Sequence, residues 1–205
     1  MDRSRVRARR VGPAMLLLAA AMVGGACVPW PPAQVIDQSF LAEQQTFSQR
    51  AQETTCDTVV TRLEVAQTFT AGRTGWLDQV SLVAVPYPSA AALLVEVRAT
   101  DGGGLPLDAA IGQGSYTGPG SPDTSTFVEL PLTEPAFVLA GVRYALVLRT
   151  ASSETCDETD VRGWNFFGSG PDYDGGAAYQ QGYIGPWGMP LGPADLFFRT
   201  WVRAL

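Results

Sequence analysis

The chain has 205 residues, and its composition restricts both its fold and its chemistry. Hydrophobic residues make up 46% and charged residues only 17%, which suits one globular domain with a processed end. The chain contains no histidine, and all 14 basic residues are arginine. Catalytic triads, histidine-bound zinc, catalytic lysine and lysine-containing phosphate loops are therefore excluded, and acid–base chemistry is left to carboxylates, tyrosine and arginine.

Residues 1–26 predict an export signal of the lipoprotein type. Five arginines precede an apolar run at residues 14–23, which is too short to span a membrane. Small residues then lead to Cys27 and resemble a bacterial lipoprotein box, in which the cysteine carries the lipid. Cleavage by an ordinary signal peptidase is the alternative. We expect residues 27–34 to be a proline-rich spacer, and the protein to be exported and anchored at the cell envelope through this N-terminal lipid only.

Removal of the signal changes the charge of the chain. It takes away five arginines and Asp2, which leaves nine arginines against nineteen acidic residues, a formal charge of about −10. A domain of this charge repels nucleic acid and anionic lipid headgroups. Nucleic acid is therefore not expected as a partner.

The three cysteines divide into one lipidation site and one pair. Export permits disulfides, and once Cys27 carries lipid, Cys56 and Cys156 remain to form one. Their spacing fits neither a Cys-x-x-Cys redox motif nor a four-ligand zinc site. Closing a loop of this length would remove about 4–5 kcal/mol of unfolded-chain entropy, so we expect the disulfide to stabilise the fold.

The same bond would gather acidic side chains from two segments. Each cysteine is followed by an aspartate, and further acids lie close by in sequence. Calcium binds six to eight oxygen ligands, so a calcium site is one interpretation. A solvated acidic surface, partly neutralised by neighbouring arginines, is the other. The candidate calcium ligands are Asp57, Asp157, Glu158 and Asp160. No other cofactor is expected.

Residues 35–205 predict a single all-β domain. Alternating or β-rich runs occupy residues 35–40, 65–71, 75–85 and 91–99, and the last run ends at an Asp-Gly-Gly-Gly turn. Six further segments of the same pattern are AAIGQGSYT, TFVELPL, RYALVLRT, VRGWNFF, GAAYQQ and DLFFRTWVRA. The 22 glycines and 15 prolines favour short strands joined by tight turns. We expect a two-sheet antiparallel β-sandwich of about ten strands.

Aromatic residues are concentrated in the last third of the chain. Exposed tryptophan and tyrosine rings present flat faces to sugars, and neighbouring polar side chains bind hydroxyl groups. The candidate ligand-binding residues are Trp187, Tyr183, Tyr173 and Trp164. Trp187 lies between proline and glycine, which favours an exposed ring. For Trp164 and Tyr179, which follow a strand alternation, the core is the favoured alternative.

Several segments in a fixed order resemble a family of bacterial extracellular jelly-roll domains. They are AQTFTAGRTGWLDQVSL, LLVEVRATDGGGLP, FVELP, GVRYALVLRT, PDYDGGAAY, PWG and DLFFRTWV. The resemblance covers residues 35 to the end. It implies a jelly-roll-like sandwich similar to carbohydrate-binding modules, and it implies no catalytic residues.

These observations predict a non-catalytic envelope lipoprotein whose domain binds carbohydrate or another envelope component. One alternative is a structural or adhesive envelope protein with no small ligand. The remaining alternative is a glycoside-active enzyme that uses a carboxylate pair, which requires two carboxyl groups at a defined separation across a cleft. Clustered acids on polar loops do not supply the contrast in pKa that such a pair needs.

Overall fold

The computed structural model describes residues 33–56, 59–87, 91–151, 163–182, 185–188 and 194–205. The chain divides into the units Met1–Trp30 and Pro31–Leu205, and all described residues belong to the second. The predicted signal, Cys27 and Cys156 lie outside the described residues. The lipid anchor and the Cys56–Cys156 disulfide therefore stay predictions.

The described residues contain strands and no helix, and strands account for 65% of these residues. The strands are β1 (Gln34–Phe40), β2 (Phe47–Cys56), β3 (Val59–Thr70), β4 (Gly75–Leu82), β5 (Ala84–Tyr87), β6 (Leu93–Thr100), β7 (Pro106–Tyr116), β8 (Val128–Val138), β9 (Arg143–Thr150), β10 (Gly163–Ser169), β11 (Ala178–Gln181), β12 (Asp195–Leu196) and β13 (Phe198–Ala204). The all-β prediction is confirmed. The strands number thirteen where about ten were predicted, because the sequence pattern did not separate or detect the shorter ones.

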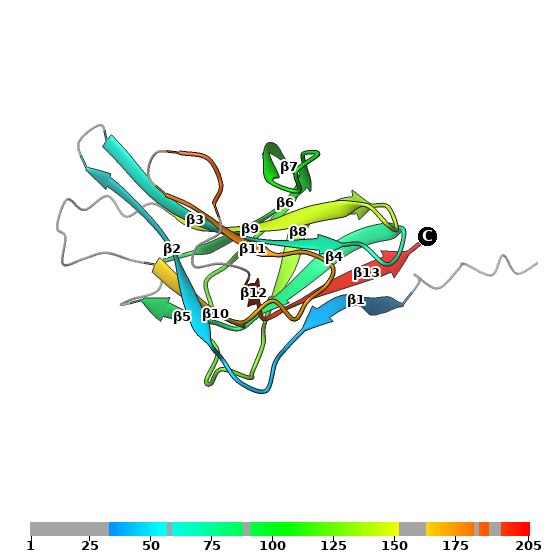
Figure 1. Ribbon diagram of the computed structural model, residues 1–205, viewed down its shortest axis with the longest axis horizontal. Coiled ribbons are helices and arrows are strands. Elements are labelled where there is room, and N and C mark those ends of the chain that lie inside the picture. Colours follow the sequence, from blue (N-terminus) through cyan, green and yellow to red (C-terminus); the bar gives the residue numbers. More distant parts are fainter. Residues whose placement is uncertain (1–32, 57–58, 88–90, 152–162, 183–184, 189–193) are drawn as a thin grey trace, which may run out of the picture. The chain divides into compact units, whose positions relative to one another are not determined.

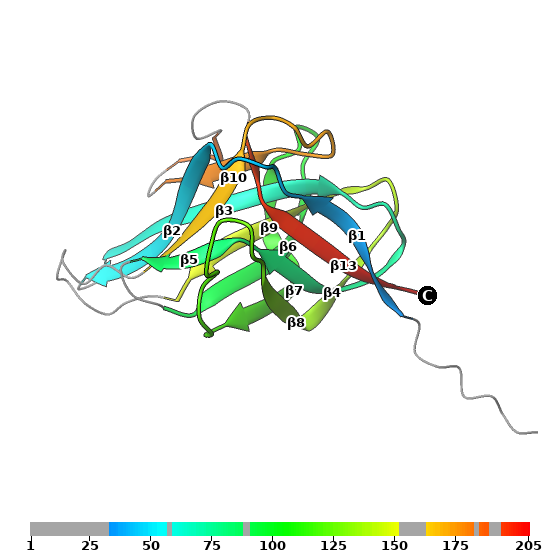
Figure 2. The ribbon, with the colours of Figure 1, turned by 90° about the horizontal axis from the view of Figure 1, so that it is seen from below.

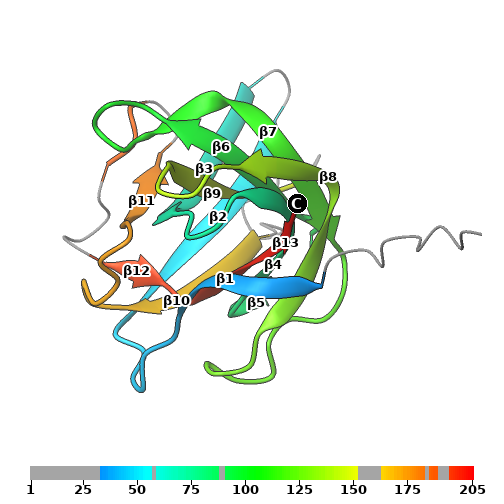
Figure 3. The same ribbon diagram turned by 90° about the vertical axis from the view of Figure 1, so that its right-hand side faces the viewer.

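The strands form one antiparallel sheet in the order β1-β13-β4-β8-β7-β6-β9-β3-β2-β10-β12 (Figure 1). In addition, β11 pairs with β3 and β5 pairs with β10. Only Val83 separates β4 from β5, so one nearly continuous segment pairs with β8 and β13 at one end and with β10 at the other. Backbone hydrogen bonds join Val83 to Phe197 and Phe167 at this junction. The sheet is thereby nearly closed into a barrel-like shape, as the end-on view of Figure 3 shows.

The single sheet differs from the two separate sheets that the sequence analysis expected. The reason lies in β3, a strand of 12 residues that pairs with β2 along its first half and with β9 along its second half. A strand shared in this way joins two groups of strands that would otherwise be separate. Alternation in sequence reports which face of a strand is buried, but it does not report how many partners the strand has.

The core lies inside the curved sheet and contains one main cluster of apolar side chains. Its largest fully buried members include Trp164, Phe69, Phe166 and Phe198. Trp164 is 0% exposed, its indole N–H donates to the Ala91 carbonyl at 2.8 Å, and its ring packs edge-on against Tyr116. On the other side of the domain β1 lies along β13, where its outer edge is free of strand partners among the described residues (Figure 2).

Candidate functional site

Charged side chains lie on the outer face of the central strands β3, β6 and β9. Strand alternation places Val65, Val95 and Leu148 in the core, so the residues beside them point to the opposite face. The outward residues are Glu64 on β3, Glu96 and Arg98 on β6, and Arg149 on β9. The register pairs Val65 with Leu148, which sets Glu64 next to Arg149. Charges from three strands are thus brought to one patch of the sheet.

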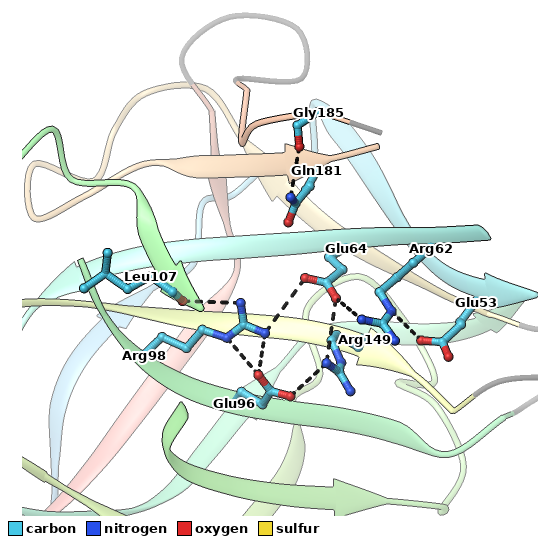
Figure 4. Close-up of polar contacts among 9 residues, drawn as sticks. All are labelled: Glu53, Arg62, Glu64, Glu96, Arg98, Leu107, Arg149, Gln181 and Gly185. Carbon is cyan, nitrogen blue, oxygen red and sulfur yellow. Dashed lines mark hydrogen bonds and ion pairs between the residues drawn. The ribbon is translucent and has the colours of Figure 1, made fainter. Parts of the chain in front are cut away.

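These side chains form a connected network of ion pairs (Figure 4). Arg98 donates through Nε and Nη2 to Glu96 Oε2, and Arg149 Nη1 lies 3.1 Å from Glu96 Oε1. The contacts of Glu64 are longer, at 3.5 Å to Arg62 Nη1, 3.8 Å to Arg149 Nη1 and 4.0 Å to Arg98 Nη2. Arg62 also donates to Glu53 at 2.7 Å. The charged network comprises Glu53, Arg62, Glu64, Glu96, Arg98 and Arg149.

Small apolar side chains lie beside the charged network on the same outer face of the sheet. Ala66, Ala145 and Val147 form a separate apolar cluster on this outer face. Tyr179 of β11 and Trp187 pack against that cluster. β11 pairs with β3 so that Gln181 lies opposite Glu64, and Gln180 forms two backbone hydrogen bonds with Gly188. Tyr179 and Trp187 therefore border the charged network, and these two residues are called the aromatic wall below.

Burial makes the charged network electrostatically unusual. Glu64 and Arg98 are each only 5% exposed, although isolated charges are almost never buried to this extent. Loss of water raises the pKa of Glu64, and the opposing attraction of Arg98, Arg149 and Arg62 does not cancel that effect. Arg149 Nε is buried and has no hydrogen-bond partner among the described residues. The network therefore has an unused donor and an incompletely compensated acceptor.

A polar cavity of about 390 Å³ opens above the charged network. Its lining residues are Arg62, Glu64, Arg98, Asp108, Arg149, Gln181 and Gly182. Gln181 contributes an amide whose nitrogen donates to the Gly185 carbonyl at 3.0 Å, which holds the side chain over the cavity (Figure 4). The volume falls within the range of about 300–1,000 Å³ that is usual for small-molecule sites.

The charges around this cavity nearly balance, which indicates the kind of ligand that it suits. Three guanidinium groups face the three glutamates of the charged network, with the exposed Asp108 beside them. Guanidinium groups are donors only and ionised carboxylates are acceptors only, so the lining offers both functions at fixed positions. A neutral ligand with several hydroxyl groups uses both. In the described part of the chain, no group of three or more Cys, Asp or Glu side chains is arranged to hold a metal ion.

The predicted ligand-binding aromatics do not share one place in the structure. Trp187 is half-buried and packs with Tyr179 against the apolar cluster on the outer face, next to the cavity but not among its lining residues. Trp164 is a core residue and presents no face to a ligand, as the alternative interpretation favoured. Tyr173 packs against the core, where it meets Phe198 edge-on at 5.1 Å. Tyr183 lies outside the described residues.

The candidate calcium ligands Asp57, Asp157, Glu158 and Asp160 all lie outside the described residues. The calcium interpretation and its solvated alternative therefore both stay open.

A second polar network holds the segment that contains β11 against the sheet. Gln67 is fully buried, and its amide nitrogen donates to Asp195 Oδ1 at 3.0 Å while its oxygen accepts from the Leu196 N–H at 2.6 Å. The backbone N–H of Tyr173 donates to Asp195 Oδ2, and the Tyr173 hydroxyl donates to Gln38 Oε1. Burial raises the pKa of Tyr173 to about 12, so the hydroxyl stays protonated as a donor. This network fixes Tyr173, at the start of the segment that leads to β11 and the aromatic wall.

The raised pKa values predict how stability depends on pH. Loss of water raises the pKa of Asp37, Glu64 and Asp195, so the folded state holds these protons more tightly than the unfolded chain does. Their stabilisation is complete below the ordinary pKa values of 3.8 and 4.5, and it is lost as the pH rises through the folded pKa values. We expect the free energy of unfolding to increase as the pH is lowered from neutral towards the ordinary pKa values of 3.8 and 4.5 in urea titrations. A constant or falling value over this interval would contradict the assignment.

Asp123 changes the free energy of unfolding in the opposite direction at more acidic pH, because its pKa is lowered. Hydrogen bonds from Ser125, and then from Thr126, lower its pKa from 3.8 to about 2. Its contribution is present above pH 3.8 and is lost as the pH falls towards 2. We therefore expect stability to pass through a maximum on the acidic side of neutral and to decline below it.

The sequence analysis missed most residues of the charged network. It predicted a strand at residues 91–99, but it assigned no site to Glu96 and Arg98 within that run. The available signal was an opposite-charge pair two residues apart in the middle of a strongly apolar strand. Exposed charges are more usual near strand ends and edges. Neighbouring arginines were considered only as neutralisers of the acids near the cysteines, and no site was assigned to Arg62, Glu64 or Arg149.

A second exposed aromatic surface lies on β4 and β8, away from the cavity. Trp76 is 43% exposed and Phe137 is 38% exposed, and their rings meet edge-on at 5.2 Å. The register pairs the two residues directly across the strands. Exposed cross-strand aromatic pairs stabilise sheets, which gives this pair a structural role.

No protein-family model matches the chain, and no curated protein matches it. The resemblance to extracellular jelly-roll domains therefore stays an expectation from the sequence. No helix in the described part of the chain is long and apolar enough to cross a membrane.

Proposed function

We propose that this protein is a non-catalytic, lipid-anchored envelope protein whose domain binds neutral carbohydrate at the cavity above the charged network. The observation that carries the proposal is the combination of a polar cavity, balanced charge and an adjoining aromatic wall. Arg62, Glu64 and Arg149 supply fixed donors and acceptors for hydroxyl groups. Trp187 and Tyr179 supply apolar ring surface beside them.

The burial of the charged network supports a binding role over a purely structural one. Buried ion pairs contribute little net stability, because the cost of removing their water offsets the attraction. The long contacts of Glu64 fit a site whose hydrogen bonds are completed by a ligand. A site that hydrogen-bonds hydroxyl groups rejects analogues that lack them, because its buried polar groups are then left unpaired.

A non-catalytic role is favoured over glycoside hydrolysis. A hydrolase needs one carboxylic acid that is protonated near neutral pH and a second carboxylate across a cleft. Here Glu64 and Glu96 face the same two arginines, Arg98 and Arg149, on one face of the sheet, so the two acids do not stand across a cleft from each other.

The fold and location that accompany this function are also part of the proposal. We interpret the nearly closed sheet as a flattened, jelly-roll-like sandwich, in which β1, β13, β4 and β8 face the remaining strands across the main core. The arginine-rich and apolar N-terminal segment supports export, and Cys27 supports the lipid anchor. A carbohydrate-binding domain on such an anchor would act at the cell envelope.

Isothermal titration of the purified domain with glucose, galactose, mannose and N-acetylglucosamine tests the proposal. We expect binding of at least one of them, and we expect Gln181→Ala to weaken it about fivefold to tenfold, since one hydrogen bond contributes about 0.5–1.5 kcal/mol. The Gln181 side chain is partly exposed and, among the described residues, its one hydrogen bond is to Gly185, so we expect its loss to leave the fold intact. Gln79→Ala is the matched control, because its bond to Glu129 lies on β4, outside the cavity.

Two results would overturn this function. One is the absence of binding to all four sugars, which would favour the structural or adhesive alternative. The other is binding that Gln79→Ala weakens as much as Gln181→Ala, which would place the ligand outside the cavity. Hydrolysis of a glycoside that Glu64→Gln abolishes would favour the enzymatic alternative.

A further inference from the structure

A second polar cavity of about 250 Å³ adjoins the first on the same outer face of the sheet. It is lined by Leu94, Val95, Glu96, Gln113, Gly114, Ser115, Thr133 and Arg149. Arg149 lines both cavities, and its ion pair with Glu96 stands between them. The two cavities are therefore parts of one groove that Arg149 bridges.

The register shows how this groove crosses the sheet. Gln181 of β11 lies opposite Glu64 of β3, which neighbours Arg149 of β9. Arg149 in turn lies opposite Leu94 of β6, which lies opposite Ser115 of β7. One continuous row thus runs over five strands, from the aromatic wall to the far side of the second cavity. The groove runs across the strands instead of along one of them.

The far end of the groove is shaped by glycine and by small polar side chains. A Cβ atom on Gly114 would lie 2.7 Å from the Pro131 carbonyl oxygen, so only glycine lets β7 approach β8 this closely. Gln113 donates to Glu134 at 2.9 Å, and Thr133 donates to the Gln113 carbonyl at 3.2 Å. These bonds keep the wall of the second cavity in place while Ser115 stays exposed to a ligand.

From this groove we propose that the ligand is a linear neutral oligosaccharide that occupies two subsites and spans Arg149. The inference rests on the proposed function and names its ligand class. The first cavity lies near the lower end of the usual volume range of about 300–1,000 Å³ and the second lies below it, so the pair suits a ligand longer than one ring. The balanced charge of Arg149 and Glu96 at the junction, together with the acidic domain around it, favours a neutral chain over an anionic one.

Arg149 has a specific role in this arrangement. Its Nη1 atom is engaged by Glu96 and Glu64, whereas its buried Nε has no partner among the described residues. Because Nε is buried, a ligand at the junction would contact Arg149 through the part of its side chain that lines the two cavities. A ligand confined to the first cavity would not need to cross the Arg149–Glu96 pair, so occupancy of both cavities is what separates this inference from the proposed function.

Titration with oligosaccharides of increasing length tests the inference. The probes are glucose and N-acetylglucosamine, each followed by its β-1,4-linked oligomers of two to six units, and the α-1,4-linked glucose series. We expect affinity to rise about tenfold or more between the monosaccharide and the trisaccharide in at least one series, and then to level off once both subsites are filled. Affinity that does not change with length would overturn the two-subsite groove and leave the single-site function standing.

Variants of the second cavity localise the gain in affinity. Ser115→Tyr fills the cavity from an exposed strand position, where tyrosine is well tolerated. We expect it to leave monosaccharide binding unchanged and to remove the gain of the trisaccharide. Ser39→Tyr on β1 is the matched control, because Ser39 is also exposed on a strand but lines neither cavity. Equal losses for monosaccharide and trisaccharide in Ser115→Tyr would overturn the inference. No binding of any probe to the unmodified domain would instead reject the proposed function itself.

Discussion

Replacing Arg98 with methionine is expected to lower the free energy of unfolding at pH 7 by about 3 kcal/mol or more. Arg98 is 5% exposed. It donates to Glu96 through two nitrogen atoms and to the Leu107 carbonyl, and it faces Glu64 at longer range. Removing one member of a buried ionic group costs about 3–5 kcal/mol, because the remaining charge is left uncompensated away from water. Arg62 and Arg149 still face Glu64, which places the expected loss near the lower end of this range. Urea unfolding measures it.

The pH dependence of this loss distinguishes an electrostatic cause from a packing defect. Without Arg98 the pKa of Glu64 rises further, since Arg98 is the leading attraction that lowers it. The folded variant then gains stability as the pH falls through that raised value, so the difference from the unmodified protein should be smaller at pH 5 than at pH 7. A loss that is the same at both pH values would indicate packing alone.

Two controls accompany the Arg98 variant. Arg203→Met on β13 breaks the pair with Asp78 on β4, in which the two side chains are 39% and 17% exposed, and it should cost less than about 1 kcal/mol. Glu64→Gln in the Arg98→Met background removes the uncompensated acid and should restore part of the loss in a double-mutant cycle. Failure of Glu64→Gln to restore any stability would contradict the proposed coupling.

Replacing Gln67 with leucine is expected to cost about 3–5 kcal/mol, although leucine has a similar volume and is more apolar. The variant leaves the Leu196 N–H without its acceptor and deprives the Asp195 carboxylate, which is 1% exposed, of one of its two donors. A buried polar group without a partner costs about 1–3 kcal/mol, and a charged one costs more. Thermal and urea unfolding measure the effect.

The same variant links stability to binding. Asp195 holds the backbone of Tyr173, and the segment that follows carries β11 and the aromatic wall. We therefore expect Gln67→Leu to weaken sugar binding as well, under conditions in which it is still folded. Gln79→Leu is the control, since its exposed bond to Glu129 has the same chemistry, and it should change stability by less than about 1 kcal/mol. Similar losses of unfolding free energy in Gln67→Leu and Gln79→Leu would show that burial does not determine the cost of removing the amide.

Sequence reasoning succeeded where local pattern reports burial. The alternation of apolar residues predicted strands near 35–40, 65–71, 75–85 and 91–99, and strands are present at β1, β3, β4–β5 and β6. The core position of Trp164 followed from the same alternation. Sequence reasoning failed on the site because the site depends on contacts that are distant in sequence. Glu64 and Arg149 lie 85 positions apart, and only the pairing of β3 with β9 sets them side by side.

The sequence by itself determined the all-β class and the available chemistry. Period-two hydrophobicity in a chain rich in glycine and proline indicates short β-strands. The absence of histidine and lysine limits the side chains that are available for catalysis. The tertiary structure decided the rest. Sharing of β3 between β2 and β9 turned two expected sheets into one, and the pairing of β11 with β3 placed Tyr179 and Gln181 beside charges to which the sequence alone had assigned no site. Strand order and register are long-range properties, because each pairing depends on residues far away in the chain, and the groove across β11, β3, β9, β6 and β7 exists only once those pairings are made.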